Sequence, residues 1–412
     1  MGTSVPDWAE QSAGIRAFGR DVFGRIVVAE VDRALVDAVR ANDGTYAVNV
    51  ARRGGIEAVR VDGVEMFDPS EAAERDMLVH ALAGASEMAT CLPSTDFYDR
   101  GDEANVADIL GRAFSLRPTL RRIVYAAEND TRAAEKLSDC VRREAGLGVR
   151  GVRFLNTTIG KMSQLTQAGR KIQGHSLKPV APGLDRAFLV EEGNHILVSE
   201  CELSGFESGL TGFERKPELR PFLEAKLYGH NAIHCILAFL AARRGYDRMP
   251  ELRGDDELME LGRRAFIDEV GEALLRKYKG LDDELFTPDG FTAYAEDLLE
   301  RMTNPYLDDA VDRVARDPVR KLGPEDRVFG AMRLVLRYEL KPRGLARGAA
   351  AGIDYVLRRA DELDLPDRLR FESADAMNED DMAAVLEWLW GARPRAVESA
   401  GDIPALLAAA GD

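Results

Sequence analysis

The segment "RIVVAEVDRALVDAVRANDG" (residues 25–44) decides the fold class, because its hydrophobic period changes partway along. Residues 25–31 are rich in β-branched apolar side chains and are typical of a buried strand. Residues 32–43 space their apolar side chains as a helix does and end at Gly44. A strand that leads directly into a helix is the building unit of a parallel sheet covered by helices. The segment therefore predicts an α/β domain.

The remainder of the first half continues this alternation. The runs at 45–51 and 56–67 are typical of strands in a small antiparallel excursion. A further helix is predicted around 105–114. Further buried strands are predicted at 86–93, 121–129 and 149–160.

Helical periodicity dominates the second half of the chain. Beta-branched runs nearly vanish after residue 205. Helix-period segments then follow one another at 218–243, 255–278, 288–301, 307–316, 325–339, 344–363 and 377–391. We therefore predict an α/β domain over residues 1–204, followed by an all-α domain over residues 205–412.

The composition fits a soluble protein with two domains. The chain has 412 residues, of which 45% are hydrophobic and 31% are charged. No apolar run reaches the roughly 18 residues of a membrane-spanning helix. The first residues also lack the basic-then-apolar pattern of a signal sequence. We expect a cytoplasmic protein that does not contact a membrane, and a monomer.

Charge and cysteine spacing narrow the range of partners. The 55 basic and 71 acidic side chains leave a formal charge of −16, which repels a phosphate backbone and argues against nucleic acid. An anionic small molecule would need a local basic cluster. The cysteines are widely spaced and form no CxxC pair, which predicts reduced thiols and no metal site. They are Cys91, Cys140, Cys201 and Cys235.

The beginning of the chain lacks one expected element. A doubly wound sheet normally opens with a strand, a glycine-rich turn and a helix whose N-terminus holds a dinucleotide pyrophosphate. Residues 1–24 contain no apolar run long enough for a strand and no GxGxxG, and we interpret their glycines as loop residues. The first strand and its glycine turn are therefore predicted to be missing or altered. A wrong coding start or frame, a substitute strand in "SVPDW" and a degraded copy are the three explanations that stay open.

Polar side chains cluster on one predicted helix, in "KLYGHNAIH" (residues 226–234). At roughly 100° per residue, His234 lies about 80° and Asn231 about 140° around the helix from Lys226, so all three can face one cleft. A lysine in a partly dry cleft has a lowered pKa and can take the proton of a secondary alcohol as hydride leaves the same carbon. An amide can stabilise the alkoxide, and a neutral imidazole can orient substrate hydroxyls. From residue chemistry alone, solvated side chains at a helix edge are the other interpretation.

The pattern K-x4-N-x2-H in this segment resembles the signature of the polyol-specific long-chain dehydrogenases, the mannitol dehydrogenase family. The resemblance runs from about Arg25 to near the C-terminus. It includes "VVAEVDRALVDAVRANDGTYAV", "AAEND", "FLNTTIGKM", "FLEAKLYGHNAIH" and "NPYLDDAVDRVARDPVRKLGPEDRV". It implies a Rossmann-type domain, a helical domain, NAD as cofactor, and metal-independent hydride transfer to or from a sugar alcohol or its phosphate.

The resemblance also implies catalytic roles. Lys226 would be the general base, and His234 would bind substrate hydroxyls. Asn231 and Asn156 would together hold the reacting oxygen. For Asn156, a turn or cap residue is the alternative interpretation.

On the cofactor side, Glu30 lies where the family places its ribose-binding acid, with Asp32 two residues further on. A carboxylate at this position repels the 2′-phosphate of NADP, which favours NAD. Asn129 would lie near the nicotinamide, although it also fits a turn or cap residue.

A basic cluster in "RVARDPVRKL" supplies candidate substrate ligands. Arg313 and Lys321 stand at the spacing at which the family's substrate-facing arginine and lysine occur, and Arg320 is a further candidate phosphate ligand. A solvated helix end, with basic residues favoured by the helix dipole, is the alternative. We expect an enzyme that interconverts mannitol 1-phosphate and fructose 6-phosphate. The alternatives are a dehydrogenase of an unphosphorylated polyol or hexuronate, and an inactive sugar-phosphate-binding homologue with a defective cofactor site.

Overall fold

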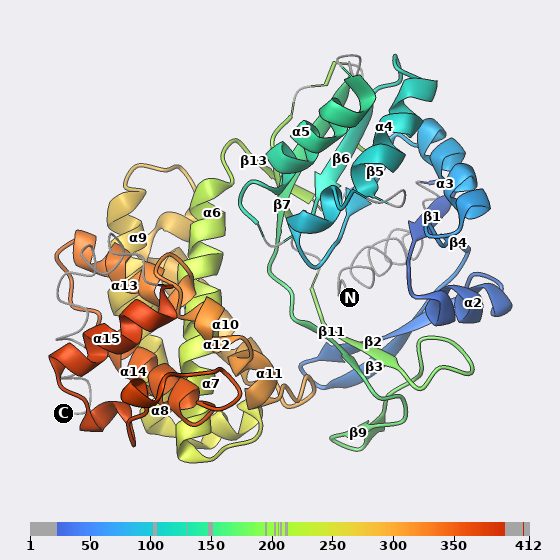
Figure 1. Cartoon of the computed structure of the whole chain (residues 1–412). Helices are drawn as coiled ribbons and strands as arrows, with labels where there is room; N and C mark the ends of the chain where they lie inside the picture. The colour runs from blue at the N-terminus through green and yellow to red at the C-terminus, as the bar shows by residue number, and fades with distance from the viewer. Residues whose placement is uncertain are drawn as a thin grey trace. The chain divides into compact units, whose positions relative to one another are not determined.

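The computed structural model describes residues 23–101, 105–128, 130–146, 151–193, 196–201, 203–204, 206, 208–210, 213–391 and 407. The chain divides into two compact units, Met1–Arg220 and Pro221–Asp412. The first combines strands with helices and the second is helical, as the sequence predicts (Figure 1). Each unit is described by itself below.

The segment that decides the fold class forms β1 (Ile26–Ala29) and α2 (Arg33–Ala41). Asp32 caps the helix, since its carboxylate accepts a hydrogen bond from the Leu35 amide at 3.2 Å. Strand β1 pairs in parallel with β4 (Val64–Phe67). The prediction for 56–67 was therefore wrong in part. The positive φ of 70° at Gly63 permits a turn there, and the residues after it join the parallel pair instead of the antiparallel excursion.

A five-stranded sheet forms the larger part of the α/β unit, in the order β13-β12-β7-β6-β5. The neighbours β5, β6 and β7 run parallel, β12 is antiparallel to β7, and β13 is parallel to β12. These strands are β5 (Glu87–Thr90), β6 (Arg122–Ala126), β7 (Val152–Ile159), β12 (Ile196–Ser199) and β13 (Phe213–Lys216). Because β13 belongs to this sheet, the α/β unit extends beyond residue 204.

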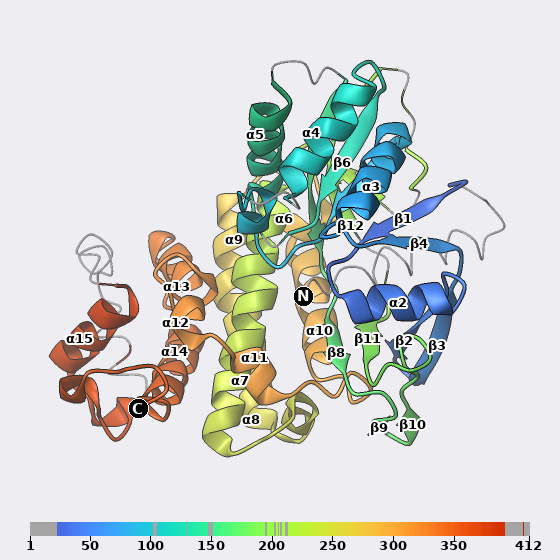
Figure 2. The ribbon, with the colours of Figure 1, turned by 45° about the vertical axis from the view of Figure 1, so that its right-hand side comes forward.

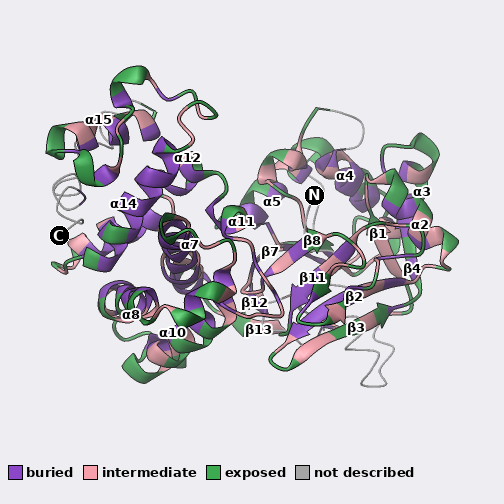
Figure 3. Cartoon of the chain, turned by 90° about the horizontal axis from the view of Figure 1, so that it is seen from below, coloured by how far each residue is buried: buried purple, intermediate pink, exposed green. Residues whose placement is uncertain are grey.

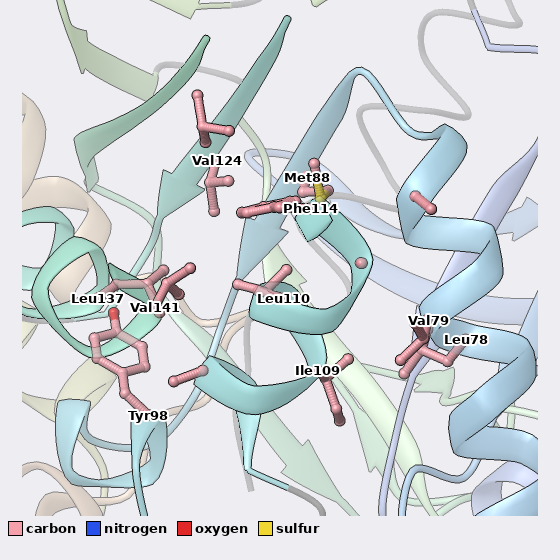
Figure 4. Packing of buried hydrophobic residues seen from close by; sticks show 14 of the residues in the cluster. Leu78, Val79, Met88, Tyr98, Ile109, Leu110, Phe114, Val124, Leu137 and Val141 are labelled. Atoms are coloured by element: carbon pink, nitrogen blue, oxygen red, sulfur yellow. The ribbon is translucent and has the colours of Figure 1, made fainter. Parts of the chain in front are cut away.

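Three helices cover one face of this sheet (Figure 1). They are α3 (Ala72–Gly84), α4 (Val106–Leu116) and α5 (Ala133–Ala145), and a short 3₁₀ helix, η1 (Thr95–Tyr98), precedes α4. The buried core between helices and strands includes Leu110, Phe114, Val124 and Leu137 (Figure 4). Burial of these apolar faces fixes the helices on the sheet.

The β1–β4 pair shares this core without sharing the sheet. Phe67 belongs to the same cluster as Met88 of β5, and Val27 packs against it. In the part of the chain that the structure describes, neither β1 nor β5 has a ladder partner on its other edge. In the common strand order the first strand lies between these two positions. The predicted loss of that strand and its glycine turn falls mainly on residues 1–22, which lie outside the described residues.

A second sheet of four strands lies beside α2 in the order β3-β2-β11-β8 (Figure 2). It consists of β2 (Tyr46–Arg52), β3 (Gly55–Val61), β8 (Ser163–Thr166) and β11 (Ala187–Glu191), and the hairpin β9 (Lys171–Ile172) with β10 (His175–Ser176) follows β8. The amide of buried Asn49 donates to the carbonyl oxygens of Lys178 and Phe188, each at 2.9 Å. A buried amide that is fully bonded holds the connecting loop onto the sheet.

The helical unit is built around α7 (Ala232–Arg244), whose residues 232–241 are all buried (Figure 3). The preceding helices are α6 (Arg220–Glu224) and η3 (Ala225–Asn231). The remaining main helices are α8 (Asp256–Arg264), η5 (Ala265–Gly271), α9 (Glu272–Lys277), α10 (Pro288–Met302), α11 (Val311–Ala315), α12 (Pro318–Lys321), α13 (Arg327–Arg337), α14 (Arg343–Leu357) and α15 (Glu379–Leu389). The short 3₁₀ helices are η4 (Met249–Gly254), η6 (Glu284–Phe286), η7 (Asp367–Leu369) and η8 (Ala374–Ala376). Among the helices of the described residues, none has the length and hydropathy to cross a membrane.

Helix α14 packs against α7 through glycines spaced four residues apart, which lie on one helix face. A Cβ added to Gly348 would lie 2.3 Å from Cβ of Ile236. A Cβ added to Gly352 would lie 2.8 Å from Cδ2 of Phe239. The two helices therefore approach at a distance that only glycine allows at these positions.

We predict that Gly348→Ala lowers the free energy of unfolding of the helical unit by about 1–3 kcal/mol, because its methyl group overpacks the contact with Ile236. Urea unfolding followed by tryptophan fluorescence measures this loss. Arg347→Ala on the same helix is the matched control, since the side chain of Arg347 is 49% exposed. We expect the control to change stability by no more than about 0.5 kcal/mol. Equal stability of Gly348→Ala and the unmodified protein would contradict the close packing.

Candidate active site

The segment "KLYGHNAIH" spans a change of helix type. Residues 225–231 form the π-helix η3, and α7 continues from Ala232. A π-helix bonds residue i to i+5, so Lys226 and Asn231 lie about one turn apart on the same side. The prediction of an ordinary α-helix, with about 140° between these two residues, was wrong here. The sequence period does not reveal a π-helix, which depends on packing.

The packing at η3 is tight. A Cβ on Gly229 would lie 2.7 Å from Cε2 of Phe266, which belongs to the second π-helix η5. The glycine therefore lets one π-helix rest against the other. Lys226 and Asn231 are partly buried at this contact, and His234 follows on the first turn of α7. Asn231 and His234 are three residues apart and are neighbours on the helix surface.

His234 is a neutral, buried imidazole. Burial is the main reason that the pKa of His234 falls to about 4. The Asp309 carboxylate opposes this shift, and its Oδ2 lies 3.9 Å from Nε2 of His234. Within the described ranges, Nε2 has no hydrogen-bond partner. This nitrogen can therefore take a hydroxyl of a substrate.

Arg313 is held by a carboxylate. Both Nε and Nη2 of Arg313 donate to Asp309, whose side chain is only 1% exposed. Helix α11, which carries Arg313, packs against α7, and Arg313 is one of the charges that lower the pKa of His234. Arg313 thus lies near His234, but much of its guanidinium is occupied by Asp309.

Lys321 and Arg320, adjacent in α12, point in different directions. Lys321 is 7% exposed, and its Nζ donates to the carbonyl oxygen of Val314 at 2.6 Å. Burial lowers the pKa of the Lys321 amine to about 8. Arg320 has a side chain that is 55% exposed and lies 3.8 Å from Asp317. The buried amine is therefore part of the cluster, whereas Arg320 is on the surface.

His230 was not among the predicted site residues. This imidazole is buried, and its ring centroid lies 6.1 Å from that of His234. Burial lowers the pKa of His230 well below its usual value, and the nearby charges of Arg301, Lys226 and Arg327 add to the effect. Asp309 and Arg327 were missed as well. The spacing of four between Asp309 and Arg313 is a helical pairing signal that could have identified the first of them.

In the α/β unit, Glu30 and Asp32 follow the carboxyl end of β1. Glu30 Oε1 accepts a hydrogen bond from the Asp32 amide at 2.9 Å. Asp32 caps α2 and also pairs with Arg186, and the hydrogen bond from Arg186 is the main reason that the pKa of Asp32 is lowered. Among the described residues, Glu30 Oε2 accepts no side-chain or backbone hydrogen bond, while both oxygens of Asp32 are in use.

Asn156 and Asn129 belong to the neighbouring strands of the same unit. Asn156 Oδ1 accepts from the Ala134 amide and Nδ2 donates to Glu135, both at 2.9 Å. The side chain of Asn156 thus holds the beginning of α5 against β7. Asn129 lies outside the described residues, so its predicted place near the nicotinamide has no structural counterpart here.

Glu128, the residue before Asn129, is a buried carboxylate that the sequence analysis did not select. It accepts hydrogen bonds from Thr90 Oγ1 at 3.0 Å, from the Leu92 amide at 2.9 Å and from the Tyr98 hydroxyl. Burial, together with this carboxylate, raises the pKa of Tyr98. Glu128 therefore ties the ends of β5 and β6 together. No group of three or more His, Cys, Asp or Glu side chains that could hold a metal ion is found among the described residues.

Comparison with solved structures agrees with this architecture. Mannitol 2-dehydrogenase of Pseudomonas fluorescens, solved as a ternary complex with NAD and D-mannitol, aligns with a TM-score of 0.65 at 15% identity, over 100% of this chain and 90% of that one. D-sorbitol dehydrogenase in its substrate-free form aligns with a TM-score of 0.71 at 11% identity, over 97% and 89%. These likenesses establish the fold class: a Rossmann-like α/β domain followed by a helical domain.

The helical unit resembles a known family of domains. Residues 218–390 match the family model of the mannitol dehydrogenase C-terminal domain. This segment contains η3, α7 and the cluster of Lys226, Asn231, His234, Arg313 and Lys321. The helical unit is therefore similar to the C-terminal domain of the mannitol dehydrogenases, in agreement with the resemblance that the K-x4-N-x2-H pattern suggested.

The two buried histidines predict acid sensitivity of the helical unit. The pKa values of His230 and His234 are both lowered in the folded state, so the unfolded chain takes up protons that the folded chain does not. Stability is then highest above about pH 6.5 and falls as the pH drops towards 4, by at most about 1.4 kcal/mol per pH unit for each histidine. Urea unfolding between pH 7 and pH 4, followed by the fluorescence of Trp388 and Trp390, measures the slope.

The variant His230→Leu isolates the effect from that of the carboxylates. It should make the dependence of stability on pH shallower, because one of the two lowered pKa values is removed. His80→Gln, at an exposed position on α3, is the matched control and should leave the slope unchanged. Parallel curves for His230→Leu and the unmodified protein would show that His230 is not buried in its neutral form.

Proposed function

We propose that this chain is an NAD-dependent oxidoreductase that interconverts mannitol 1-phosphate and fructose 6-phosphate, as a mannitol-1-phosphate 5-dehydrogenase does. The observation that carries the proposal is the cluster of Lys226, Asn231 and His234 beside the buried cations of a helical domain of this family. The whole protein carries a formal charge of −16, so this concentration of basic groups is local. A basic cluster in an acidic protein favours an anionic substrate.

The three side chains can divide the chemistry among them. Lys226 acts as the general base that accepts the proton of the reacting hydroxyl. Asn231, on the same side of the π-helix, donates its amide to the developing alkoxide. His234 stays neutral at neutral pH because its pKa is about 4, and its unpaired Nε2 orients a substrate hydroxyl. Asn156 is proposed as the second amide, which requires it to exchange its present contact with Glu135 for the substrate.

NAD, when bound, supplies the hydride acceptor. Glu30 fits the ribose end of this cofactor, since it follows a parallel strand and its Oε2 has no hydrogen-bond partner among the described residues. Its charge disfavours a 2′-phosphate, which supports NAD over NADP. Asp32 is proposed to act indirectly by capping α2 and holding Arg186, and Asn129 to lie near the nicotinamide. A solved relative of the same fold contains NAD and D-mannitol, which supports the cofactor assignment.

An unphosphorylated polyol or a hexuronate is the second candidate substrate. The two solved structures of similar fold are named for mannitol and sorbitol, neither of which carries a phosphate. The engagement of Arg313 with Asp309 also favours this alternative. A homologue without redox activity is the remaining alternative, and it is favoured by the unpaired edges of β1 and β5 within the described part of the sheet.

We predict that Lys226→Ala lowers kcat by a factor of about 10² to 10⁴ because the general base is lost. Affinity for NADH should stay nearly unchanged. The oxidation of NADH by fructose 6-phosphate, followed by NADH absorbance, measures kcat, and NADH fluorescence measures affinity. Lys279→Ala, at an exposed position after α9, is the control. Retained turnover in Lys226→Ala would remove this residue from the mechanism.

We predict that fructose 6-phosphate is reduced with a kcat/KM about tenfold to hundredfold above that of fructose, the value of one charge-assisted contact to a phosphate. Steady-state kinetics on both sugars at the same ionic strength measures the ratio. Equal values would favour the unphosphorylated-polyol alternative.

A further inference from the structure

Arg327 is the first residue of α13, beside the π-helix that carries Lys226. The contact between the two helices is close, because a Cβ added to Gly330 of α13 would lie 2.7 Å from Cε1 of Tyr228. Asp326 precedes the helix, and its carboxylate accepts a hydrogen bond from the Arg327 amide at 2.7 Å. The position of Arg327 is therefore fixed both by the start of its helix and by the packing of that helix on η3.

The guanidinium of Arg327 is largely buried, and only part of it donates hydrogen bonds. Its side chain is 12% exposed, and within the described ranges its side chain donates one hydrogen bond, from Nε to Asp326 Oδ1 at 2.8 Å. Neither Nη group donates a hydrogen bond to an acceptor among the described residues. Some polar side-chain atoms of those residues are fully buried without a partner, and the Nη groups of Arg327 are not among them. The two Nη groups therefore reach solvent and can bind a ligand.

The other basic residues of the cluster are less available. Arg313 already donates from Nε and Nη2 to the buried carboxylate of Asp309. Lys321 donates to a backbone carbonyl oxygen and is buried. Arg320 is on the surface, with a side chain that is 55% exposed. Arg327 is thus the cation of the cluster whose planar fork stays open.

The charge of Arg327 acts on three other ionisable groups of the cluster. Its charge is among those that lower the pKa values of His230, His234 and Lys321. These three groups lie on η3, α7 and α12, and helix α13, which begins with Arg327, contacts both η3 and α7. The carboxylate of Asp326 offsets part of its charge through Nε and leaves the outer side of the fork positive.

We propose that the two Nη groups of Arg327 bind the phosphate of the substrate, so that Arg327 is the residue that selects a sugar phosphate over the free sugar. Arginine matches a phosphate with two parallel N–H···O bonds, and partial burial strengthens such bonds. The inference rests on the proposed function and refines it. In this assignment Arg313 positions Asp309 beside His234, and it leaves the phosphate contact to Arg327.

The test measures binding of fructose 6-phosphate and of fructose by calorimetry, with the unmodified protein and with Arg327→Met. We expect Arg327→Met to weaken fructose 6-phosphate binding by about tenfold to hundredfold, the loss of one charge-assisted contact. In steady-state kinetics, the ratio of kcat/KM for fructose 6-phosphate over that for fructose should fall by the same factor. Arg337→Met, at an exposed position on the same helix, is the matched control and should leave the ratio unchanged.

Arg327→Lys guards against a folding defect, because it keeps the charge and removes the fork. We expect it to weaken fructose 6-phosphate binding by at least about threefold, since a lysine replaces a bidentate contact by a single point charge. An unchanged ratio and unchanged binding in both variants would overturn the proposal. Arg327 would then be a structural residue at the start of α13.

The role of Arg327 and the proposed function are distinguished by different outcomes. If the unmodified protein prefers fructose 6-phosphate and Arg327→Met keeps that preference, the role of Arg327 is wrong while the proposed function stands. If the unmodified protein reduces fructose as efficiently as fructose 6-phosphate, the phosphorylated substrate and the role of Arg327 both fall, and dehydrogenase activity remains. If the protein binds fructose 6-phosphate through Arg327 but reduces neither sugar, the inference stands and the redox function fails.

Discussion

The close approach of α7 and α14 is the contact on which the helical unit depends. Gly348 and Gly352 present bare backbone to Ile236 and Phe239, so α7 is enclosed along its length. This enclosure excludes water from the histidine and the cysteine of α7, and burial raises the pKa of the Cys235 thiol to about 11. A helix that is apolar on all sides is stable only when it is packed on all sides. The polar residues at its beginning are therefore functional candidates rather than surface groups.

A second constraint acts at the beginning of α14. Glu269, in the π-helix η5, accepts hydrogen bonds from the amides of Gly344 at 2.6 Å and Leu345 at 3.1 Å. Its burial raises the pKa of this carboxylate, and the two amides counteract the shift. The same π-helix contacts Gly229 through Phe266. One short element thus supports both the central helix packing and the π-helix that aligns Lys226 with Asn231.

The cluster in the helical unit contains more basic than acidic side chains. These side chains differ in their protonation and in their hydrogen-bond partners. Asp309 is paired with Arg313, and His234 and His230 are neutral because burial lowers their pKa values. Lys321 is held by a carbonyl oxygen. A buried cation without a counter-ion is costly. In the proposed function a substrate anion would relieve that cost, and this is the physical reason for proposing a phosphorylated ligand.

The sequence by itself determined the order of the two domains, β1 and α2, and the residues of the family pattern, because hydrophobic period and short motifs are local properties. It also indicated Glu30 at the end of a strand and the basic run around Arg313. It did not reveal the short strands between 163 and 216, whose pairing is non-local, nor the ladder that joins residues 64–67 to β1. Only the tertiary structure decided that residues 225–231 form a π-helix, that Asp309 occupies Arg313 and that Arg327 keeps an open fork. These features depend on which side chains meet across helices, and that is set by packing rather than by spacing along the chain.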